Sequence, residues 1–195
     1  MRSAITSVRR APGANDAIVK ALGETLFADA EDRVYAVLDA AASDTMLADL
    51  CRLKPKFECL YRGNLTPDMA WVAPYLVRLE PGSAFTRLVF ESGWGKNWGI
   101  FATSLAEFDD VRRHFRRFLM VHTSEGKPLH FRYYDPRVIR EFFPIADAEQ
   151  IQTMFGPLKA WFGEGAAETE MLRFEARKGA AVKKVVDLTR VVVRR

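Results

Sequence analysis

The side chains best suited to hold a metal ion in this chain are three histidines, His114, His122 and His130, which recur every eight residues. A four-residue loop over 124–127 predicts a hairpin register that points His122 and His130 to opposite faces. No cysteine or acidic side chain stands beside them at the spacing typical of zinc ligands. We therefore expect no metal site and no cofactor.

Nucleophilic catalysis also lacks its usual sequence pattern. A catalytic Ser or Cys needs a neighbouring base and is often presented on a sharp G-x-S-x-G turn, which does not occur here. Cys59 has no cation on its own strand face, because Arg62 stands at an odd spacing from it. The glycines Gly93, Gly95 and Gly99 match neither a P-loop nor a dinucleotide fingerprint and predict a tight turn instead. We expect no catalytic residues and predict that the protein is not an enzyme.

A basic cluster lies near the end of a predicted long helix, opposite its apolar stripe. Ser104 with Glu107 is typical of a capping box that begins this helix. The helix dipole favours cations in the last turn, so the cluster either binds phosphate or forms a solvated face. The cluster consists of Arg112, Arg113, Arg116 and Arg117.

The segment 131–144, FRYYDPRVIREFFP, holds the most specific arrangement of charges. Asp135 stands where a helix N-cap is favoured and is followed by proline at the first helical position. Arg137, however, falls in the first turn, where the helix dipole disfavours a cation. We therefore expect Arg132 or Arg137 to pair with a carboxylate elsewhere, such as Asp39 or Glu80 at strand ends, either as a structural ion pair or as part of a binding site.

The net charge of +4 is unevenly distributed. Residues 177–195 contain seven Lys and Arg against Asp187 alone, which gives +6, so the other 176 residues carry −2. This C-terminal strip could attract nucleic acid, acidic lipid or an acidic protein face. It could equally be a solvated strand edge whose cations prevent aggregation.

The chain predicts a cytoplasmic protein without a membrane anchor. No apolar run approaches the roughly 20 residues of a transmembrane helix, and the early arginines of the N-terminus precede no apolar signal-peptide core. Cys51 and Cys59 lack a disulfide framework and fit reduced thiols.

Hydrophobic periodicity predicts an α/β protein with an α+β tendency: a mixed β-sheet covered by helices and completed by a C-terminal strand pair. We expect a flexible segment over 1–14, one domain over 15–165, and a basic strand pair over 166–195 packed on that domain. Expected strands cover 33–40, 57–63, 73–80, 99–104, 119–123, 129–134, 171–177 and 182–193. Expected helices begin near Asn15, Ser43, Ser83, Ser104, Asp135 and Asp147, with a last helical turn reaching Trp161 and Phe162.

The order of several motifs resembles the family of adaptor chaperones of the bacterial type VI secretion system. The resemblance runs from about Val34 to Phe162 and is carried by VYAVLDAA, CLYRG, APYLVRLE, WGIFATS, HFRRFLMV, FRYYDPRVIREFFP and MFGPLKAWF. It implies a non-enzymatic protein that binds a cognate effector toxin and loads it onto the VgrG spike. It brings no catalytic residues. The residues that we expect to matter for binding or structure are Trp98, Arg116, Arg117, Arg132, Asp135 and Arg137.

Two other functions stay open from the sequence. One is a phosphate-ligand-binding domain built on the Arg-rich helix, and the other is a nucleic-acid-binding domain using the basic C-terminal tail. Nucleic-acid binding would weaken steeply with salt, and we rank both below the adaptor.

Overall fold

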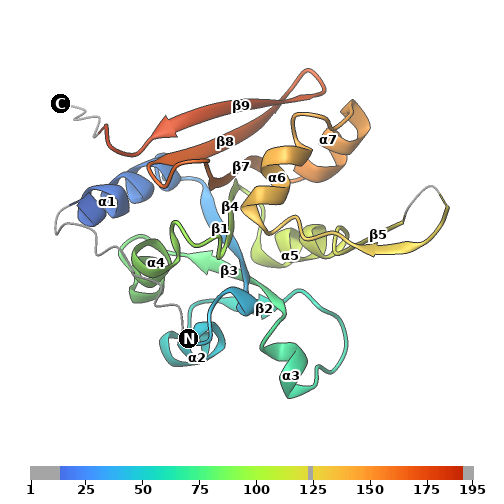
Figure 1. The fold of residues 1–195 in the computed structure, drawn as a ribbon, viewed down its shortest axis with the longest axis horizontal. Helices are drawn as coiled ribbons and strands as arrows, with labels where there is room; N and C mark the ends of the chain where they lie inside the picture. The colour runs from blue at the N-terminus through green and yellow to red at the C-terminus, as the bar shows by residue number, and fades with distance from the viewer. Residues whose placement is uncertain (1–13, 123–124, 191–195) are drawn as a thin grey trace, which may run out of the picture.

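The computed structural model describes residues 14–122 and 125–190. Its strands are β1 (Arg33–Asp39), β2 (Phe57–Cys59), β3 (Pro74–Leu79), β4 (Gly99–Ser104), β5 (Met120–His122), β6 (Pro128–His130), β7 (Leu158–Glu164), β8 (Glu170–Arg177) and β9 (Ala180–Asp187). Seven of them form one sheet in the order β2-β3-β1-β4-β7-β8-β9, while β5 and β6 form a hairpin that projects from the body (Figure 1). Every neighbouring pair is antiparallel, whereas the sequence suggested mixed pairing.

The sheet is sandwiched between two layers of helices. The helices are α1 (Ala14–Leu26), α2 (Met46–Leu53), α3 (Pro67–Ala70), α4 (Ala84–Leu88), α5 (Phe108–Arg116), α6 (Pro136–Phe142) and α7 (Ala148–Phe155), with a 3-10 turn η1 (Ala40–Ala42) and a π-helical turn η2 (Val89–Gly93). The predicted α/β class is therefore confirmed.

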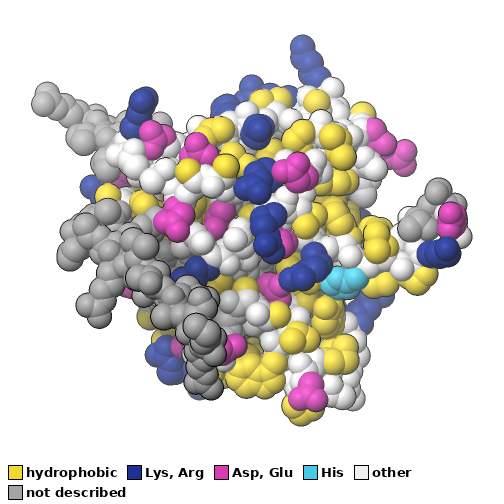
Figure 2. Space-filling model, viewed as in Figure 1, with side chains coloured by type: hydrophobic (Ala, Val, Ile, Leu, Met, Phe, Trp, Pro, Cys, Tyr) yellow, Lys and Arg dark blue, Asp and Glu magenta, His cyan; other side chains and the backbone are white. Residues whose placement is uncertain are grey.

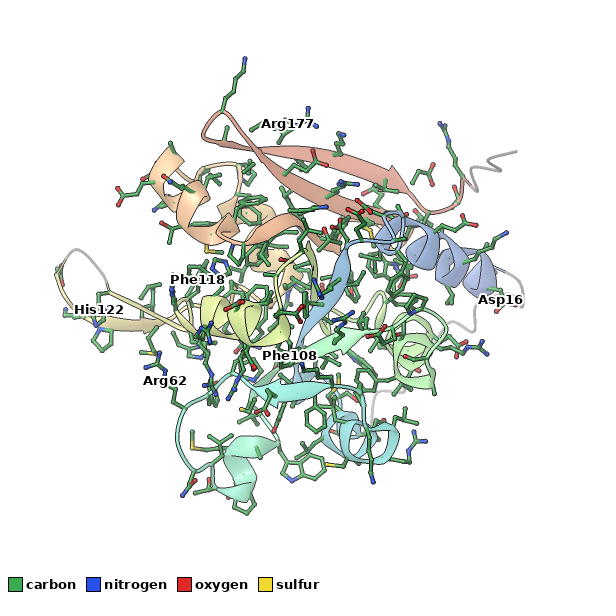
Figure 3. The ribbon with its side chains drawn as sticks, turned by 180° about the vertical axis from the view of Figure 1, so that it is seen from behind. Asp16, Arg62, Phe108, Phe118, His122 and Arg177 are labelled. Atoms are coloured by element: carbon green, nitrogen blue, oxygen red, sulfur yellow. The ribbon has the colours of Figure 1, made fainter. Side chains whose placement is uncertain are left out.

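Central strands β1 and β4 are buried on both faces, which is why their sequences are continuously apolar. Side chains of β1 alternate between two hydrophobic cores. Val34, Ala36 and Leu38 pack with α1, α2 and α4, while Tyr35 and Val37 pack with α5, α6 and α7. Figure 1 shows these two helix groups on opposite sides of the sheet, and Figure 3 labels Phe108, the buried first residue of α5.

The segment after Pro157 corrects one prediction. Trp161 and Phe162 do not end a helix but lie in β7, with Trp161 in one core and Phe162 in the other. A strand between β4 and β8 must be apolar on both faces, and such a short run cannot be distinguished from a buried helix by periodicity. The strand expected over 57–63 is also shorter, ending at Cys59.

Ser104 does not cap the long helix, which begins only at Phe108. Ser104 is the buried last residue of β4: its hydroxyl donates to the Pro157 carbonyl at 2.6 Å and accepts from the Ala106 amide at 3.0 Å. Glu107, expected inside the helix, occupies the N-cap position and pairs with Arg33. The predicted capping box therefore does not form, because Ser104 and Glu107 bind residues outside the helix.

The hairpin register also differs from the prediction. His122 pairs with Pro128 and Met120 with His130, one residue away from the predicted register. One residue of slip reverses the faces, and His122 and His130 therefore lie on the same face of the hairpin. In Figure 3, His122 lies out on this hairpin, away from the sheet.

The C-terminal strand pair is confirmed as β8 and β9, and it continues the main sheet through β7. Strand β9 ends at Asp187, so residues 188–190 of the strand predicted over 182–193 are not in it. Of the segment expected to be flexible over 1–14, residue 14 begins α1. Residues 1–13 and 191–195 lie outside the described residues. Within the described ranges, no helix is both long and apolar enough to cross a bilayer.

Candidate functional site

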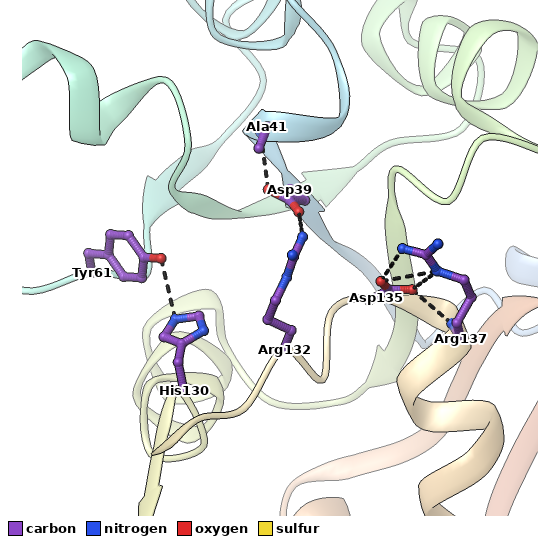
Figure 4. A network of polar contacts seen from close by, with 7 residues as sticks. All are labelled: Asp39, Ala41, Tyr61, His130, Arg132, Asp135 and Arg137. Atoms are coloured by element: carbon purple, nitrogen blue, oxygen red, sulfur yellow. Dashed lines mark hydrogen bonds and ion pairs between the residues drawn. The ribbon is translucent and has the colours of Figure 1, made fainter. Parts of the chain in front are cut away.

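A charged pocket of about 270 Å³ lies at one end of the sheet. Strands β1 and β7 both run antiparallel to β4, so their last residues meet the loop that enters β4. The start of α6 closes the same end (Figure 4). The lining residues are Asp39, Ala41, Ala42, Lys96, Asn97, Arg132, Asp135 and Arg137. Figure 2 shows cationic and acidic side chains intermixed at the centre of this face of the molecule.

Asp39 and Arg132 form the long-range ion pair of the pocket. The Arg132 guanidinium donates to Oδ2 of Asp39 at 2.5 Å, across 93 positions of sequence. Asp39 is 5% exposed and also accepts the Ala41 amide at 3.0 Å, which caps η1. Burial disfavours the charge of Arg132, but its bond to Asp39 outweighs burial and raises the pKa of Arg132. The expected partnership between Arg132 and Asp39 is confirmed.

The loop holding Arg132 is fixed by its aromatic neighbours. Tyr133 is fully buried, stacks on Phe115 with ring centroids 5.6 Å apart, and donates its hydroxyl to the Phe115 carbonyl at 2.9 Å. The Arg132 guanidinium in turn lies 5.7 Å from the centre of the Tyr134 ring. Tyr133 and Tyr134 are therefore both buried while Arg132 reaches the pocket, and residues 131–134, expected as part of a strand, are not in one.

Asp135 and Arg137 form the second ion pair, which is local. Asp135 caps α6 by accepting the Arg137 amide at 2.9 Å, as predicted, and accepts both Nε and a terminal nitrogen of the same guanidinium. Burial alone would raise the pKa of Asp135, but these bonds and the charge of Arg137 lower it. The helix dipole disfavours a cation in the first turn, but Arg137 is stabilised there by its ion pair with the N-cap residue, Asp135. Its partner is therefore not a distant carboxylate.

Glu164, the last residue of β7, is a third buried carboxylate beside the pocket. Its Oε1 accepts the Asn97 amide at 2.9 Å, and it is only 8% exposed. Burial, with the charges of Glu168 and Asp135, raises the pKa of Glu164 to about 7. Sequence reasoning missed this residue because GEGAAE resembles a linker; the apolar run before it was the available signal for a buried strand.

Trp98 supports the pocket from the core. Its ring is 7% exposed, and its carbonyl accepts the Asp39 amide at 2.8 Å. Gly93 lies so close that a β-carbon there would come within 2.6 Å of the ring. Lys96, on the pocket rim, lies 5.9 Å from the centre of the same ring. Trp98 therefore fixes the position of the loop that enters β4 and packs in the core.

The Arg-rich helix does not line this pocket. Arg116 donates to three backbone carbonyls, those of Cys59, Leu60 and Tyr61, at 2.9, 3.1 and 2.9 Å. Burial and the neighbouring Arg112 lower the pKa of Arg116. Arg117 is exposed. Of the six predicted site residues, the structure brings together Arg132, Asp135 and Arg137, places Trp98 beside them, and separates Arg116 and Arg117 from the pocket lining.

The other chemistry-bearing side chains are engaged structurally. Nε2 of His114 lies 2.9 Å from the Met154 carbonyl, and burial lowers the pKa of His114. Nε2 of His130 lies 3.3 Å from the Tyr61 hydroxyl. Burial raises the pKa of the Cys59 thiol, which disfavours the thiolate. Across residues 14–122 and 125–190, no group of three or more His, Cys, Asp or Glu could hold a metal ion.

Comparison with known families gives a match whose residues include both ion pairs. The model of a family described as "Domain of unknown function (DUF4123)" matches residues 34–153. The chain belongs to this family. DUF4123 is associated with effector adaptors of type VI secretion. No curated protein and no solved structure matches this chain.

Proposed function

We propose that this DUF4123 protein is a non-enzymatic, cytoplasmic adaptor chaperone, which binds one effector toxin and loads it onto the VgrG spike of a type VI secretion system. The observation that carries the proposal is the family match, because it spans residues 34–153 and includes Asp39, Arg132, Asp135 and Arg137. Family membership thus coincides with the most specific polar arrangement of the chain.

The geometry of the pocket supports a role in recognition. Asp39 and Asp135 are buried and hold one side of each guanidinium, while the Arg132 and Arg137 side chains remain 52% and 62% exposed. Fixing an arginine in this way lowers the entropy lost when its outer N–H groups bind a carboxylate or carbonyl of another protein. An adaptor needs such preorganised binding and no bond chemistry.

The phosphate-binding alternative has less support. Arg112 pairs with Glu58 at 3.5 Å, Arg113 pairs with Asp110, and Arg116 is occupied by backbone carbonyls. Arg113 and Arg117 are the exposed members of the cluster, and Arg113 already has a carboxylate partner.

Deletion of the gene in its native bacterium tests the proposal. We expect export or stability of one effector to be lost while the secretion system itself still fires, and we expect that effector and VgrG to co-purify with the tagged protein. An Arg132→Ala, Arg137→Ala variant should complement the deletion less well than wild type. Normal export of every effector without the protein, together with no co-purification of toxin or spike, contradicts the proposal.

A further inference from the structure

Strand β9 forms one edge of the main sheet and is eight residues long. Lys178 and Gly179 both have positive φ, 49° and 79°, as in the two-residue type I′ turn of a hairpin. In such a hairpin the flanking pair, Arg177 with Ala180, exchanges both hydrogen bonds, and the pattern then alternates along the register. The backbone groups of alternate residues therefore point away from β8 at positions 181, 183, 185 and 187.

The edge presents cations and apolar surface together. Lys183 and Lys184 are exposed and, like Lys178 in the turn, form no ion pair with a carboxylate of the described residues. Val185, which follows the two lysines in β9, is 56% exposed. Figure 2 shows Lys and Arg side chains along the upper surface, where Figure 1 places β8 and β9.

The opposite edge of the sheet is closed. Strand β2 has only three residues, and Arg116 binds the carbonyls of Cys59, Leu60 and Tyr61 there. The chain thus covers one edge with a partly buried guanidinium contact and leaves the other as a long row of backbone donors and acceptors, which is a template for a further strand.

We propose that the outward edge of β9 binds an extended, acidic segment of another protein as an eighth strand of the sheet. Lys183 and Lys184 face opposite sides of the sheet, so acidic side chains of the segment would lie beside one lysine or the other according to register. Backbone hydrogen bonds would form at positions 181, 183 and 185, because the Asp187 carbonyl already accepts the Arg190 amide at 3.3 Å. The identity of the partner rests on the proposed function, since the segment would belong to the effector or the spike.

Charge argues against the other occupants of this edge. Two copies of β9 paired antiparallel about Lys183 or Lys184 would set lysine against lysine, which destabilises the pair. The register centred on Val185 avoids this clash but pairs only the last part of the strand. The chain's own ends are basic in sequence, with Arg2, Arg9 and Arg10 at one end and Arg194 and Arg195 at the other. An acidic strand from a different protein matches both the backbone and the charge.

A direct test uses the full chain and an end-blocked eight-residue peptide of alternating Glu and Val, followed by fluorescence anisotropy and backbone amide NMR. We expect saturable binding with amide shifts concentrated on β9. A Lys-Val peptide should not bind, and neither should a Glu-Val peptide whose alternate amides are N-methylated, because it cannot complete the ladder. The N-methylated control needs no protein variant and so stays informative whatever a mutation does to folding.

Two variants separate the backbone from the charge. Val185→Pro removes one outward N–H and no bond to β8, so affinity should fall at least about tenfold, while Val185→Ala should stay within about twofold of wild type, since it keeps that N–H. Lys183→Glu with Lys184→Glu should reverse the preference to the Lys-Val peptide.

Several results would overturn the proposal. Equal binding of the N-methylated peptide, or unchanged affinity in Val185→Pro, rules out strand addition. A dimer that Val185→Pro disrupts assigns the edge to a second copy. Salt-sensitive binding of duplex DNA that depends on the lysines but not on Val185→Pro, without peptide binding, assigns it to nucleic acid. Peptide binding is measured without the secretion system, so this inference and the proposed function can fail separately.

Discussion

The two ion pairs of the pocket use the same chemistry and differ in how the chain builds them. Asp135 and Arg137 are two positions apart, and their contact needs only the first turn of α6. Asp39 and Arg132 are 93 positions apart and meet only when β1 and the loop before α6 are both in place. The first pair strengthens a helix end, whereas the second joins two separate parts of the fold.

Two ion pairs of the same chemistry therefore need not contribute equally to the free energy of unfolding. Asp39 holds both Arg132 and the η1 amide, so removing it releases two segments. Asp135 holds one helix end, and its second partner is largely exposed. The predictions below test this difference, from the largest expected effect to the smallest.

Asp39→Ala should lower the free energy of unfolding by about 3 kcal/mol, because a hydrogen bond to a charged group contributes roughly 1.5–3 kcal/mol and a cap about 1 kcal/mol. Urea unfolding near neutral pH measures the change. Asp39→Asn is the matched control: it keeps an acceptor for the Ala41 amide and should lose only the ion pair. A loss below that of Asp135→Ala would reverse the comparison.

Glu164→Gln should change how stability depends on pH. The pKa of Glu164 is raised from 4.5 to about 7 in the folded protein, so the folded state holds the proton more tightly. Its contribution is present below the unfolded pKa and is lost as pH rises toward 7.

The difference in unfolding free energy, wild type minus Glu164→Gln, should therefore fall by roughly 2 kcal/mol between about pH 5 and about pH 8. Taking the difference matters because His114, whose pKa is lowered, has the opposite sign below pH 6.5. A difference that stays flat over this range would show that Glu164 is not held in an unfavourable charged state.

Asp135→Ala should cost about 1 kcal/mol through loss of the α6 cap. The loss is limited because removing this charge also relieves Glu164, whose pKa Asp135 raises. Thermal unfolding measures the loss, and Asp135→Asn should recover most of it by keeping the acceptor. A shift as large as that of Asp39→Ala would mean that Asp135, too, joins separate parts of the fold.

Arg137→Ala should cost the least, about 0.5 kcal/mol or less. The guanidinium is 62% exposed, and without it Asp135 still accepts the backbone amide of residue 137. From the sequence, Arg137→Ala is expected to cost more than Asp135→Ala if the partner carboxylate is buried. Asp135 is buried, but it keeps the backbone amide as a partner, so the structure favours the smaller cost. A double-mutant cycle should give a smaller coupling energy for Asp135 with Arg137 than for Asp39 with Arg132.

The sequence predicted those features that depend on neighbouring residues. The cap at Asp135 with Pro136 and the helix start at Asp147 appear as expected. Both form within one helical turn, and Asp147 makes a capping box with Gln150. The continuous apolar runs of β1 and β4 also identified strands buried on both faces.

Features that depend on distant residues could not be decided in this way. The sequence offered Asp39 and Glu80 as alternative partners, and only the fold selected Asp39. Ser104 matched a helix cap but was taken by the Pro157 carbonyl, and Arg116 matched an anion site but was taken by the edge of β2. Glu164 resembled a linker residue until β7 buried it.

By itself, the sequence determined which residues could carry the pocket's charge and where α6 begins, since hydrogen bonds within a turn are fixed by local backbone geometry. The tertiary structure alone decided which carboxylates are buried, which guanidiniums are engaged, and which edge of the sheet stays open. Those outcomes depend on how antiparallel strands far apart in the chain are brought together, and a local pattern does not contain that information.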